Sequence, residues 1–203
     1  MTKKILITGA NGQLGHEMRN ALKGNNRFEC IFTDVAELDI CNAEAVKQII
    51  ADNHIDYIVN CAAYTQVDKA EDNAELCKKI NTDAVENLAR AAADYGARMI
   101  HISTDYVFNG RGYSPYTEDM PPDPQSVYGS TKLEGEKILT DICPESIIIR
   151  TAWLYSPYGN NFVKTMLHLG EEREELSVVA DQIGTPTCAA ASHKQSLSYC
   201  KRI

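Results

Sequence analysis

The chain has 203 residues, 44% of them hydrophobic and 24% charged, which is typical of one globular domain with a sizeable core. Lys and Arg total 20 against 28 Asp and Glu, and the resulting charge of −8 argues against nucleic acid as a partner, since its phosphate backbone needs a basic face. No apolar run approaches the ~18 residues of a membrane span, and because Met1 to Lys4 lead directly into a strand pattern we expect no secretory signal. With seven cysteines but no CxxC pair, we expect a cytoplasmic protein with free thiols and no metal site.

Short strand patterns alternate along the chain with longer helical patterns. The apolar periodicity predicts strands at residues 4–8, 29–33, 57–60, 99–103, 146–150 and 176–179, and helices at 14–22, 43–51, 74–95, 127–142 and 161–169. Such alternation predicts parallel strands joined by right-handed crossovers. We therefore expect an α/β fold with a doubly wound parallel sheet, of the Rossmann type that binds dinucleotides.

Residues 109–126 interrupt this alternation. The segment holds two glycines and four prolines, which disfavour regular structure and predict a long surface loop. A loop of this length beside the carboxyl edge of a sheet is more often part of a site than a plain connection. We expect it to contribute to substrate binding.

The first predicted strand runs into Gly9-Ala10-Asn11-Gly12-Gln13-Leu14-Gly15, where glycines recur every third residue before a helix begins. Glycine lets the backbone turn tightly and approach a pyrophosphate, whose charge meets the N–H groups at the start of that helix. An ordinary glycine-rich turn would have the same composition, but here Asp34 also ends the second strand about 20 residues further on. The context favours dinucleotide binding, whereas Asp34 alone would fit a plain turn equally well.

Tyr128 and Lys132 stand four residues apart in a predicted helix and therefore lie on one face of it. An ammonium close to a phenol stabilises the phenolate and lowers a pKa that is about 10 in water, which suits a tyrosine that exchanges a proton near neutral pH. Thr104 follows the fourth strand at the sheet edge where this topology forms its sites, although such a hydroxyl also caps its own backbone. The glycine spacing and the Tyr/Lys pair resemble the short-chain dehydrogenase/reductase group.

Longer motifs narrow this similarity. They are GANGQLG (9–15), ELDI (37–40), VNCAAYTQVDKAE (59–71), STDYVFNG (103–110), VYGSTKLEGE (127–136), RTAWLY (150–155), GNNFVKTM (159–166) and DQIGTPT (181–187). In this order they resemble the dTDP-4-dehydrorhamnose reductase family, from Lys4 to about Ala190. The resemblance implies reduction, by NADPH or NADH, of the 4-keto group of dTDP-4-dehydro-6-deoxy-L-mannose to dTDP-L-rhamnose, a precursor of surface polysaccharides.

The resemblance also implies roles for individual residues. Tyr128 would donate a proton to the keto oxygen, Lys132 would hold a nicotinamide-ribose hydroxyl and lower the pKa of Tyr128, and Thr104 would hydrogen-bond the reacting oxygen. Asp105 and Trp153 would contact the substrate, although a lone Trp after a strand is otherwise more often part of a core. The cofactor would be bound by Gly9, Gly12, Gln13, Leu14 and Gly15 at the pyrophosphate, by Asp34, Asp39 and Ile40 near the adenosine, and by Ala62, Ala63, Tyr64 and Ile102 along its flank, together with Tyr128 and Lys132.

The expected ligands are therefore NADPH or NADH and a nucleotide sugar. Members of the family can carry magnesium, but no cluster of metal ligands is visible in this sequence, and the full-length family leaves a homodimer open as the assembly. An Asp34 carboxylate at the adenosine ribose would repel a 2′-phosphate and so favour NADH modestly.

The sequence departs from the family after the DQIGTPT motif. The family continues for roughly another third of a chain, which forms much of the substrate side, whereas the residues after Ala190 show neither helical nor strand periodicity. We expect a dinucleotide-binding domain at residues 1–187, with its substrate loop at 109–126, and an aberrant tail without an independent fold at 188–203. Two alternatives to an active reductase stay open: a non-catalytic dinucleotide-binding regulatory subunit and an inactive truncated reductase.

Overall fold

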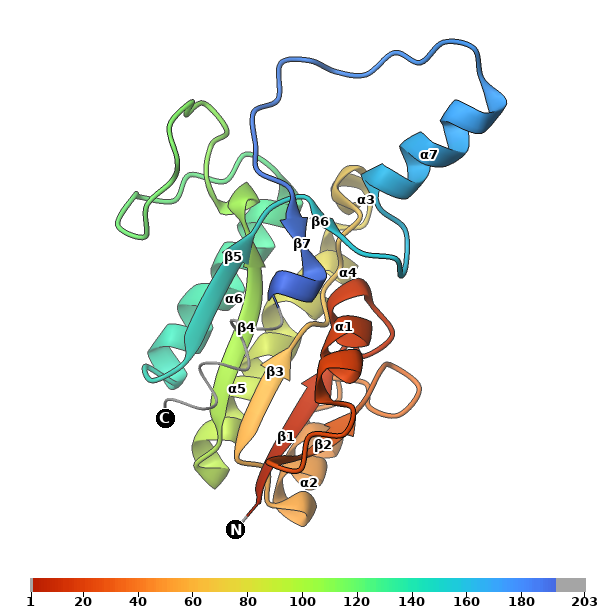
Figure 1. Ribbon diagram of the computed structural model, residues 1–203. Helices are drawn as coiled ribbons and strands as arrows, with labels where there is room; N and C mark the ends of the chain where they lie inside the picture. Colours follow the sequence, from red (N-terminus) through yellow and green to blue (C-terminus); the bar gives the residue numbers. More distant parts are fainter. Residues whose placement is uncertain (1, 193–203) are drawn as a thin grey trace.

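A five-stranded parallel sheet forms the centre of the computed structural model, which describes residues 2–192 (Figure 1). Its strands are β1 (Lys3–Thr8), β2 (Phe28–Phe32), β3 (Tyr57–Asn60), β4 (Arg98–Thr104) and β5 (Ile147–Thr151), in the spatial order β2-β1-β3-β4-β5. The chain passes from β1 to β2 and then returns to the other side of β1 with β3, so the winding reverses at β1. This reversal opens a ligand crevice at the carboxyl ends of the strands, and it confirms the predicted doubly wound sheet.

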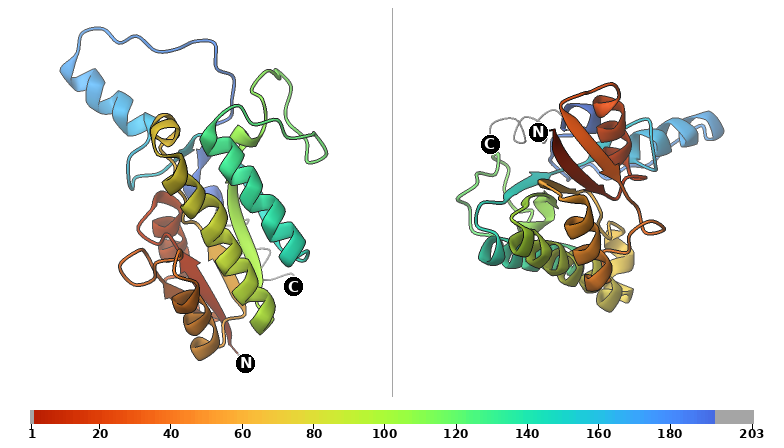
Figure 2. Two further views of the ribbon diagram at one scale, coloured as in Figure 1. Left: turned by 180° about the vertical axis from the view of Figure 1, so that it is seen from behind. Right: turned by 90° about the horizontal axis from the view of Figure 1, so that it is seen from below.

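Helices cover both faces of the sheet (Figure 2). One face carries α2 (Ala43–Asn53), α5 (Ala84–Tyr95) and α6 (Val127–Ile142), which pack side by side in that order. The other face carries α1 (Gln13–Leu22). The strand-to-helix connections at the carboxyl edge therefore bring the start of α1 and the start of α6 to the same end of the molecule.

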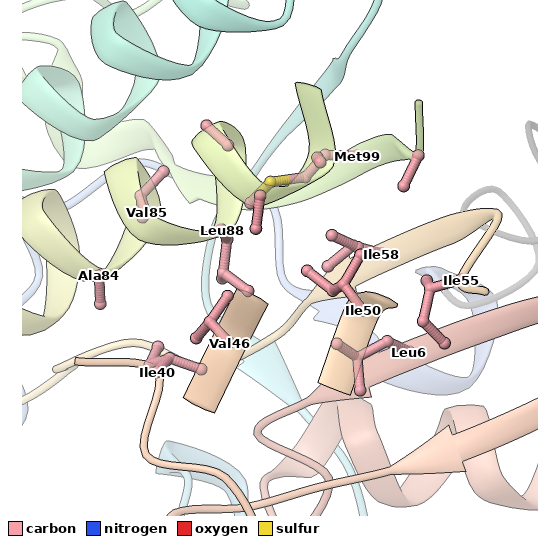
Figure 3. Packing of buried hydrophobic residues seen from close by; sticks show 14 of the residues in the cluster. Leu6, Ile40, Val46, Ile50, Ile55, Ile58, Ala84, Val85, Leu88 and Met99 are labelled. Atoms are coloured by element: carbon pink, nitrogen blue, oxygen red, sulfur yellow. The ribbon is translucent and has the colours of Figure 1, made fainter. Parts of the chain in front are cut away.

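Successive strand residues point into two separate cores. Leu6 of β1 packs with Ile50 of α2 in the first core (Figure 3), whereas its neighbours Ile5 and Ile7 pack with Met18 of α1 in the second. Because both faces are covered, β1 is a continuous apolar run rather than an alternating one. Removing each such side chain from water contributes roughly 1.5–3 kcal/mol, so both cores hold the sheet edge in place.

The last described residues also cover the second face. β6 (Leu154–Tyr155) and β7 (Thr187–Cys188) form a parallel pair, and a helical turn at 189–192 follows, with Ala189 fully buried in the second core. The expected boundary between residues 187 and 188 therefore falls inside β7, and packed chain continues to Ser192. Residues 193–203 lie outside the described part, so the absence of an independent fold there stays a prediction.

Other segments differ from the sequence prediction. The helix expected at 74–95 is divided into α4 (Ala74–Lys78), a π-helical turn η1 (Lys79–Asp83) and α5, and an unpredicted short helix α3 (Val67–Asp72) precedes it. The strand predicted at 176–179 is wrong, because no strand of the described chain pairs with this apolar segment, which forms an exposed coil. Helix α7 (Phe162–Glu172) is present as predicted but buries none of its residues.

Two helix glycines provide a test of close backbone packing at the glycine-rich loop. A Cβ at Gly15 would lie 2.4 Å from the Gly9 carbonyl oxygen, whereas a Cβ at Gly170 would meet nothing within 4 Å. We predict that Gly15→Ala lowers the free energy of unfolding by about 2 kcal/mol or more through backbone overpacking. Gly170→Ala is the matched control and should raise it by about 0.5–1 kcal/mol, because alanine is the better helix former. Urea titrations of both variants measure this, and equal effects of one sign would contradict it.

Candidate active site

The glycine-rich loop joins β1 to α1 at the carboxyl edge. Gly9 has a φ of +63°, and a Cβ there would lie 2.6 Å from the backbone nitrogen of Ala62, so only glycine fits this crossing of two strand ends. The backbone N–H of Gly12 donates to the Gly9 carbonyl at 3.0 Å, and Gly12 then caps α1 without a side chain. The first N–H groups of α1 are thus left free of a capping side chain, which is the arrangement that binds a pyrophosphate.

A cavity of about 540 Å³ opens beside this loop, between the ends of β1, β2 and β3. The structure brings together seven of the residues predicted for the cofactor in its wall: Gly9, Gly12, Asp34, Asp39, Ile40, Ala62 and Ala63. Both Asp34 carboxylate oxygens accept backbone hydrogen bonds, from Asn11 and Val35, each at 2.9 Å. The Asp34 carboxylate is therefore fixed at the wall of the cavity by the glycine-rich loop and by its own turn.

Two of the predicted cofactor side chains point elsewhere. Leu14 is 4% exposed and its side chain packs in the second core, so only its backbone is left for the predicted contact with a pyrophosphate. The Gln13 amide ties α1 to the segment after β5, because it donates to the Leu154 carbonyl at 3.2 Å and accepts from the Asn161 amide at 2.9 Å. These two side chains position the loop instead of lining the cavity, and a helix pattern alone does not distinguish these roles.

Tyr128 and Thr104 meet at the end of β4, as the sequence predicts. Tyr128 lies in the first turns of α6 and is 8% exposed, and the edge of its ring packs on Tyr106 with the ring centroids 5.5 Å apart. Burial raises the pKa of Tyr128 to about 12, while its hydrogen bond with Thr104 acts in the lowering direction and the Asp105 charge acts in the raising direction. The structure thus gives Tyr128 a raised pKa where a lowered one is expected, since desolvation outweighs the favourable contact.

Lys132 lies one helical turn after Tyr128 but is directed at β4. Its side chain is fully buried; Nζ donates to the Ile102 carbonyl at 2.7 Å and lies 3.0 Å from Nε2 of His101. Burial lowers the pKa of Lys132 to about 8, against smaller raising effects of Glu136, Cys61 and Cys77. The amine that the sequence predicts beside the phenol therefore makes its hydrogen bonds to β4. Ile102, which is predicted to flank the cofactor, contacts Lys132 through its backbone carbonyl.

Tyr64 joins the site through the π-helical turn. Its backbone N–H donates to the Asn81 side-chain oxygen at 2.9 Å, and its carbonyl accepts from the Asn81 amide at 3.1 Å. Its side chain packs against the cluster that contains Tyr128 and Cys77. The break in the predicted helix thus provides the residue that fixes the loop after β3.

A second cavity, of about 520 Å³, is bordered by Asp105 and Tyr106, which follow β4. It is lined by Trp153, by residues 181–183 and by much of the predicted substrate loop, from Asn109 to Tyr113, with Tyr116, Gln125 and Ser126. Trp153 has a φ of +47°, which is strained for a bulky residue, and its ring leaves only a glycine's space at Gly184, where a Cβ would lie 3.0 Å from it. Burial raises the pKa of Asp105, which borders this cavity. Strain of this kind gathers at binding sites.

Two buried polar residues escaped the sequence prediction. Asn60 ends β3 and His101 lies within β4, and both side chains are 0% exposed. Their signal in the sequence is a polar residue inside an apolar strand pattern, but strand register is needed to show that they are neighbours.

Among the described residues, no three or more His, Cys, Asp or Glu side chains are grouped so that they could hold a metal ion. Within the same part of the chain, no helix has the length and apolar character required to cross a membrane.

The switch-point cavity, the glycine-rich loop and the fold around them define a Rossmann-type domain of the kind that binds dinucleotides. The family model described as RmlD substrate binding domain matches residues 3–200. The chain belongs to the dTDP-4-dehydrorhamnose reductase family.

Individual relatives agree with this assignment. A dTDP-4-dehydrorhamnose reductase from Aggregatibacter actinomycetemcomitans is 47% identical over 184 residues, which cover 91% of this chain and 63% of the relative. The crystal structure of a dTDP-4-dehydrorhamnose reductase from Clostridium acetobutylicum is 50% identical and has a TM-score of 0.95, covering 98% of this chain and 70% of that one. The enzyme from Bacillus anthracis in complex with NADP is 42% identical, also with a TM-score of 0.95, covering 99% and 71%. The chain thus spans less than two thirds of the curated relative.

The buried lysine makes a prediction about stability. Because the pKa of Lys132 is lowered from 10.5 to about 8, the unfolded chain binds one more proton than the folded chain between these pH values, and the stability of the protein rises with pH there. Below about pH 8 the full cost of burying the charge is present. We predict that the free energy of unfolding of the wild type, relative to Lys132→Met, increases by roughly 2–4 kcal/mol from pH 8 to pH 10.5.

Urea denaturation at a series of pH values measures this difference. The exposed Lys137 in the same helix provides the control, because Lys137→Met should leave the pH dependence of the wild type unchanged. A constant difference between wild type and Lys132→Met would contradict the prediction.

Proposed function

We propose that this chain binds NADPH or NADH and reduces the 4-keto group of dTDP-4-dehydro-6-deoxy-L-mannose to dTDP-L-rhamnose. The observation that carries the proposal is the buried Thr104–Tyr128 contact at the end of β4, because one cavity lies at the ends of the neighbouring strands β1 to β3 and another is lined by residues that follow β4 and β5. One cavity is next to the glycine-rich loop, where a dinucleotide is bound in this topology, and the other is next to the substrate loop. A proton donor between a cofactor site and a sugar site is what the reduction of a ketone requires.

The residues around the first cavity fit a dinucleotide. The free N–H groups at the start of α1 would hold the pyrophosphate, and the wall formed by Asp34, Asp39 and Ile40 would hold the adenosine half. Tyr64 and the Ala62–Ala63 backbone would lie along the other half, close to Tyr128 and Lys132. When bound, the nicotinamide supplies the hydride.

Tyr128 provides the proton in this proposal. Its pKa of about 12 keeps the phenol fully protonated at neutral pH, so the O–H is available to a carbonyl oxygen that gains negative charge. The Thr104 hydroxyl contacts the phenol and donates its one hydrogen to the Asp105 carboxylate at 3.3 Å. In this proposal the hydroxyl turns from Asp105 to the reacting oxygen when the keto sugar is bound and then acts as its second donor.

The second cavity is the proposed sugar-nucleotide site. Asp105 offers a carboxylate to sugar hydroxyls, and the half-exposed Trp153 ring offers a flat apolar face. We propose that the protein acts in the cytoplasm, in the synthesis of a surface polysaccharide, with a nucleotide sugar as its partner and without nucleic acid. The proposal includes neither a bound magnesium ion nor a defined oligomer.

A direct assay tests this function. The purified chain is mixed with NADPH and the dTDP-keto sugar, NADPH oxidation is followed by absorbance, and dTDP-L-rhamnose is identified by chromatography. Turnover that depends on the sugar supports the proposal. Binding of NADPH without turnover would instead favour a dinucleotide-binding subunit or an inactive truncated reductase, and absence of both binding and turnover would overturn the proposal.

We predict that Tyr128→Phe lowers the turnover number by about 100-fold or more, because the ring is kept and only the proton donor is lost. Binding of NADPH, measured by its fluorescence, should stay within about twofold of wild type. Tyr95→Phe is the control, since this exposed tyrosine ends α5 at the opposite edge of the sheet and should leave both quantities unchanged. Nearly normal turnover in Tyr128→Phe would show that another group supplies the proton.

We also predict that the fixed Asp34 carboxylate favours NADH over NADPH, because it repels a 2′-phosphate. Asp34→Asn should improve the affinity for NADPH relative to NADH by about tenfold, which corresponds to about 1.4 kcal/mol. Titration of each nucleotide measures the ratio, and Asp52→Asn on the exposed side of α2 serves as the control. Equal affinities that Asp34→Asn does not change would contradict this role.

A further inference from the structure

A row of buried polar side chains crosses the sheet beneath the active site. Thr8 of β1, Asn60 of β3 and His101 of β4 are register partners on adjacent strands, and Lys132 of α6 meets the last of them. All four are at most 1% exposed. In such a place each hydrogen atom needs an acceptor, so the direction of every bond in the row can be worked out.

The Asn60 amide has one allowed orientation. Its Oδ1 accepts from the Ala62 backbone N–H at 3.1 Å and from the Thr8 hydroxyl at 2.7 Å. A flipped amide would set its NH₂ group against that backbone N–H, two donors facing each other. Oδ1 therefore faces Ala62, and the Nδ2 group faces Nδ1 of His101, 3.1 Å away.

This orientation fixes the protonation of His101. Because the Asn60 NH₂ group can only donate, Nδ1 of His101 must accept and carries no hydrogen. The imidazole is then neutral and its one hydrogen is on Nε2. Burial and the nearby Lys132 both lower the pKa of His101 well below its ordinary value, which agrees with a neutral ring.

The Nε2–H of His101 points at Nζ of Lys132 over 3.0 Å. An ammonium has three hydrogens and no lone pair, so it cannot accept this bond, whereas a neutral amine can. The amine also donates to the Ile102 carbonyl at 2.7 Å, so one of its hydrogens and its lone pair are both satisfied. The observed contact is therefore the contact of an uncharged lysine.

We propose that His101 is a positioning residue that holds Lys132 as a neutral amine against β4, and that Lys132 must leave His101 when it takes up a proton. Asn60 enforces this selection, because it decides which ring nitrogen of His101 carries the hydrogen. Thr8 and Ala62 act one step earlier, because they orient Asn60.

The other groups around Lys132 do not reverse the preference for a neutral amine in contact with His101. Cys61 at the end of β3 is a neutral thiol, because burial raises its pKa to about 12, and Cys77 of α4 shares a hydrogen bond with Thr131. Glu136 of α6 is the nearby anion, but Arg150 of β5 neutralises it at 2.6 Å. Tyr128 on the same helix stays a protonated phenol. Burial, which is the largest cause, outweighs the raising effects of Glu136, Cys61 and Cys77 and brings the pKa of Lys132 to about 8, and a donor at Nε2 of His101 acts in the same direction as burial.

This inference rests on the proposed reductase function for its consequence. Because the pKa of Lys132 is about 8, most of Lys132 is the ammonium at neutral pH, where it must leave His101 and is available to stabilise a Tyr128 phenolate after the phenol has given its proton to a keto oxygen. Above about pH 8 the neutral amine stays against β4 and gives the phenolate no such support.

The tautomer of His101 is measured by NMR on the 203-residue chain with ¹⁵N-labelled histidine, without cofactor or substrate. The signals are assigned by their loss in His101→Gln. We expect a neutral ring with its hydrogen on Nε2 from pH 6 to pH 9. A hydrogen on Nδ1, or a ring that becomes charged in this range, would overturn the proposal.

A second measurement follows Lys132 itself. Asn60→Asp keeps the shape of Asn60 but replaces the NH₂ group by an acceptor, so His101 should move its hydrogen to Nδ1 and offer Nε2 to an ammonium. We expect the pKa of Lys132, followed by NMR of its side chain, to rise by about one pH unit or more. Asn25→Asp in an exposed turn adds the same charge and should leave it unchanged.

His101→Gln is the second variant in case Asn60→Asp does not fold. Its amide oxygen can accept from an ammonium, so the pKa of Lys132 should rise here as well. An unchanged pKa in a folded variant, or the same rise in Asn25→Asp, would overturn the selection by His101. Because the wild-type measurement needs no cofactor, a failed reductase assay leaves it intact, and a wrong tautomer leaves the reductase assay intact.

Discussion

Exclusion of water determines the charge of each ionisable group at the carboxyl edge of the sheet. Burial raises the pKa of Tyr128, lowers that of Lys132 and keeps His101 neutral, so three groups that would otherwise differ in charge are all driven toward their uncharged forms. The two cores on either side of the sheet make this possible, because they hold β4 and α6 together closely enough to exclude solvent. If α6 packed less tightly, water would reach Tyr128 and Lys132, and their pKa values would return toward those of the free side chains.

Much of the fold follows from patterns within single segments. The alternation of apolar strands with amphipathic helices predicted β1 to β5 and most helices within a residue or two, since both faces of a parallel sheet need apolar cover. The predictions failed where contacts with other parts of the chain, or their absence, decide the local structure. Residues 176–179 are apolar but have no strand beside them, and the helix predicted at 74–95 breaks where Asn81 turns to hold Tyr64.

The candidate site was predictable as far as its motifs extend. The glycine spacing, Asp34 and the Thr104, Tyr128 and Lys132 set all lie at the expected edge. The contacts of Lys132 were not predictable, because Asn60 and His101 are 41 residues apart and become neighbours only through strand register. A sequence motif shows which side chains are present, whereas the hydrogen-bond polarity of their surroundings decides their protonation states.

Trp153 combines a strained backbone with a ring that is 43% exposed at the second cavity, the proposed sugar-nucleotide site, and packed over Gly184. It is also the chain's single tryptophan. Its fluorescence emission therefore arises from one place, the wall of that cavity, without background from other indoles. Occupation of the cavity, or a shift of residues 181–183 against the ring, would change the polarity around this one fluorophore, so the protein contains its own optical reporter of the substrate side.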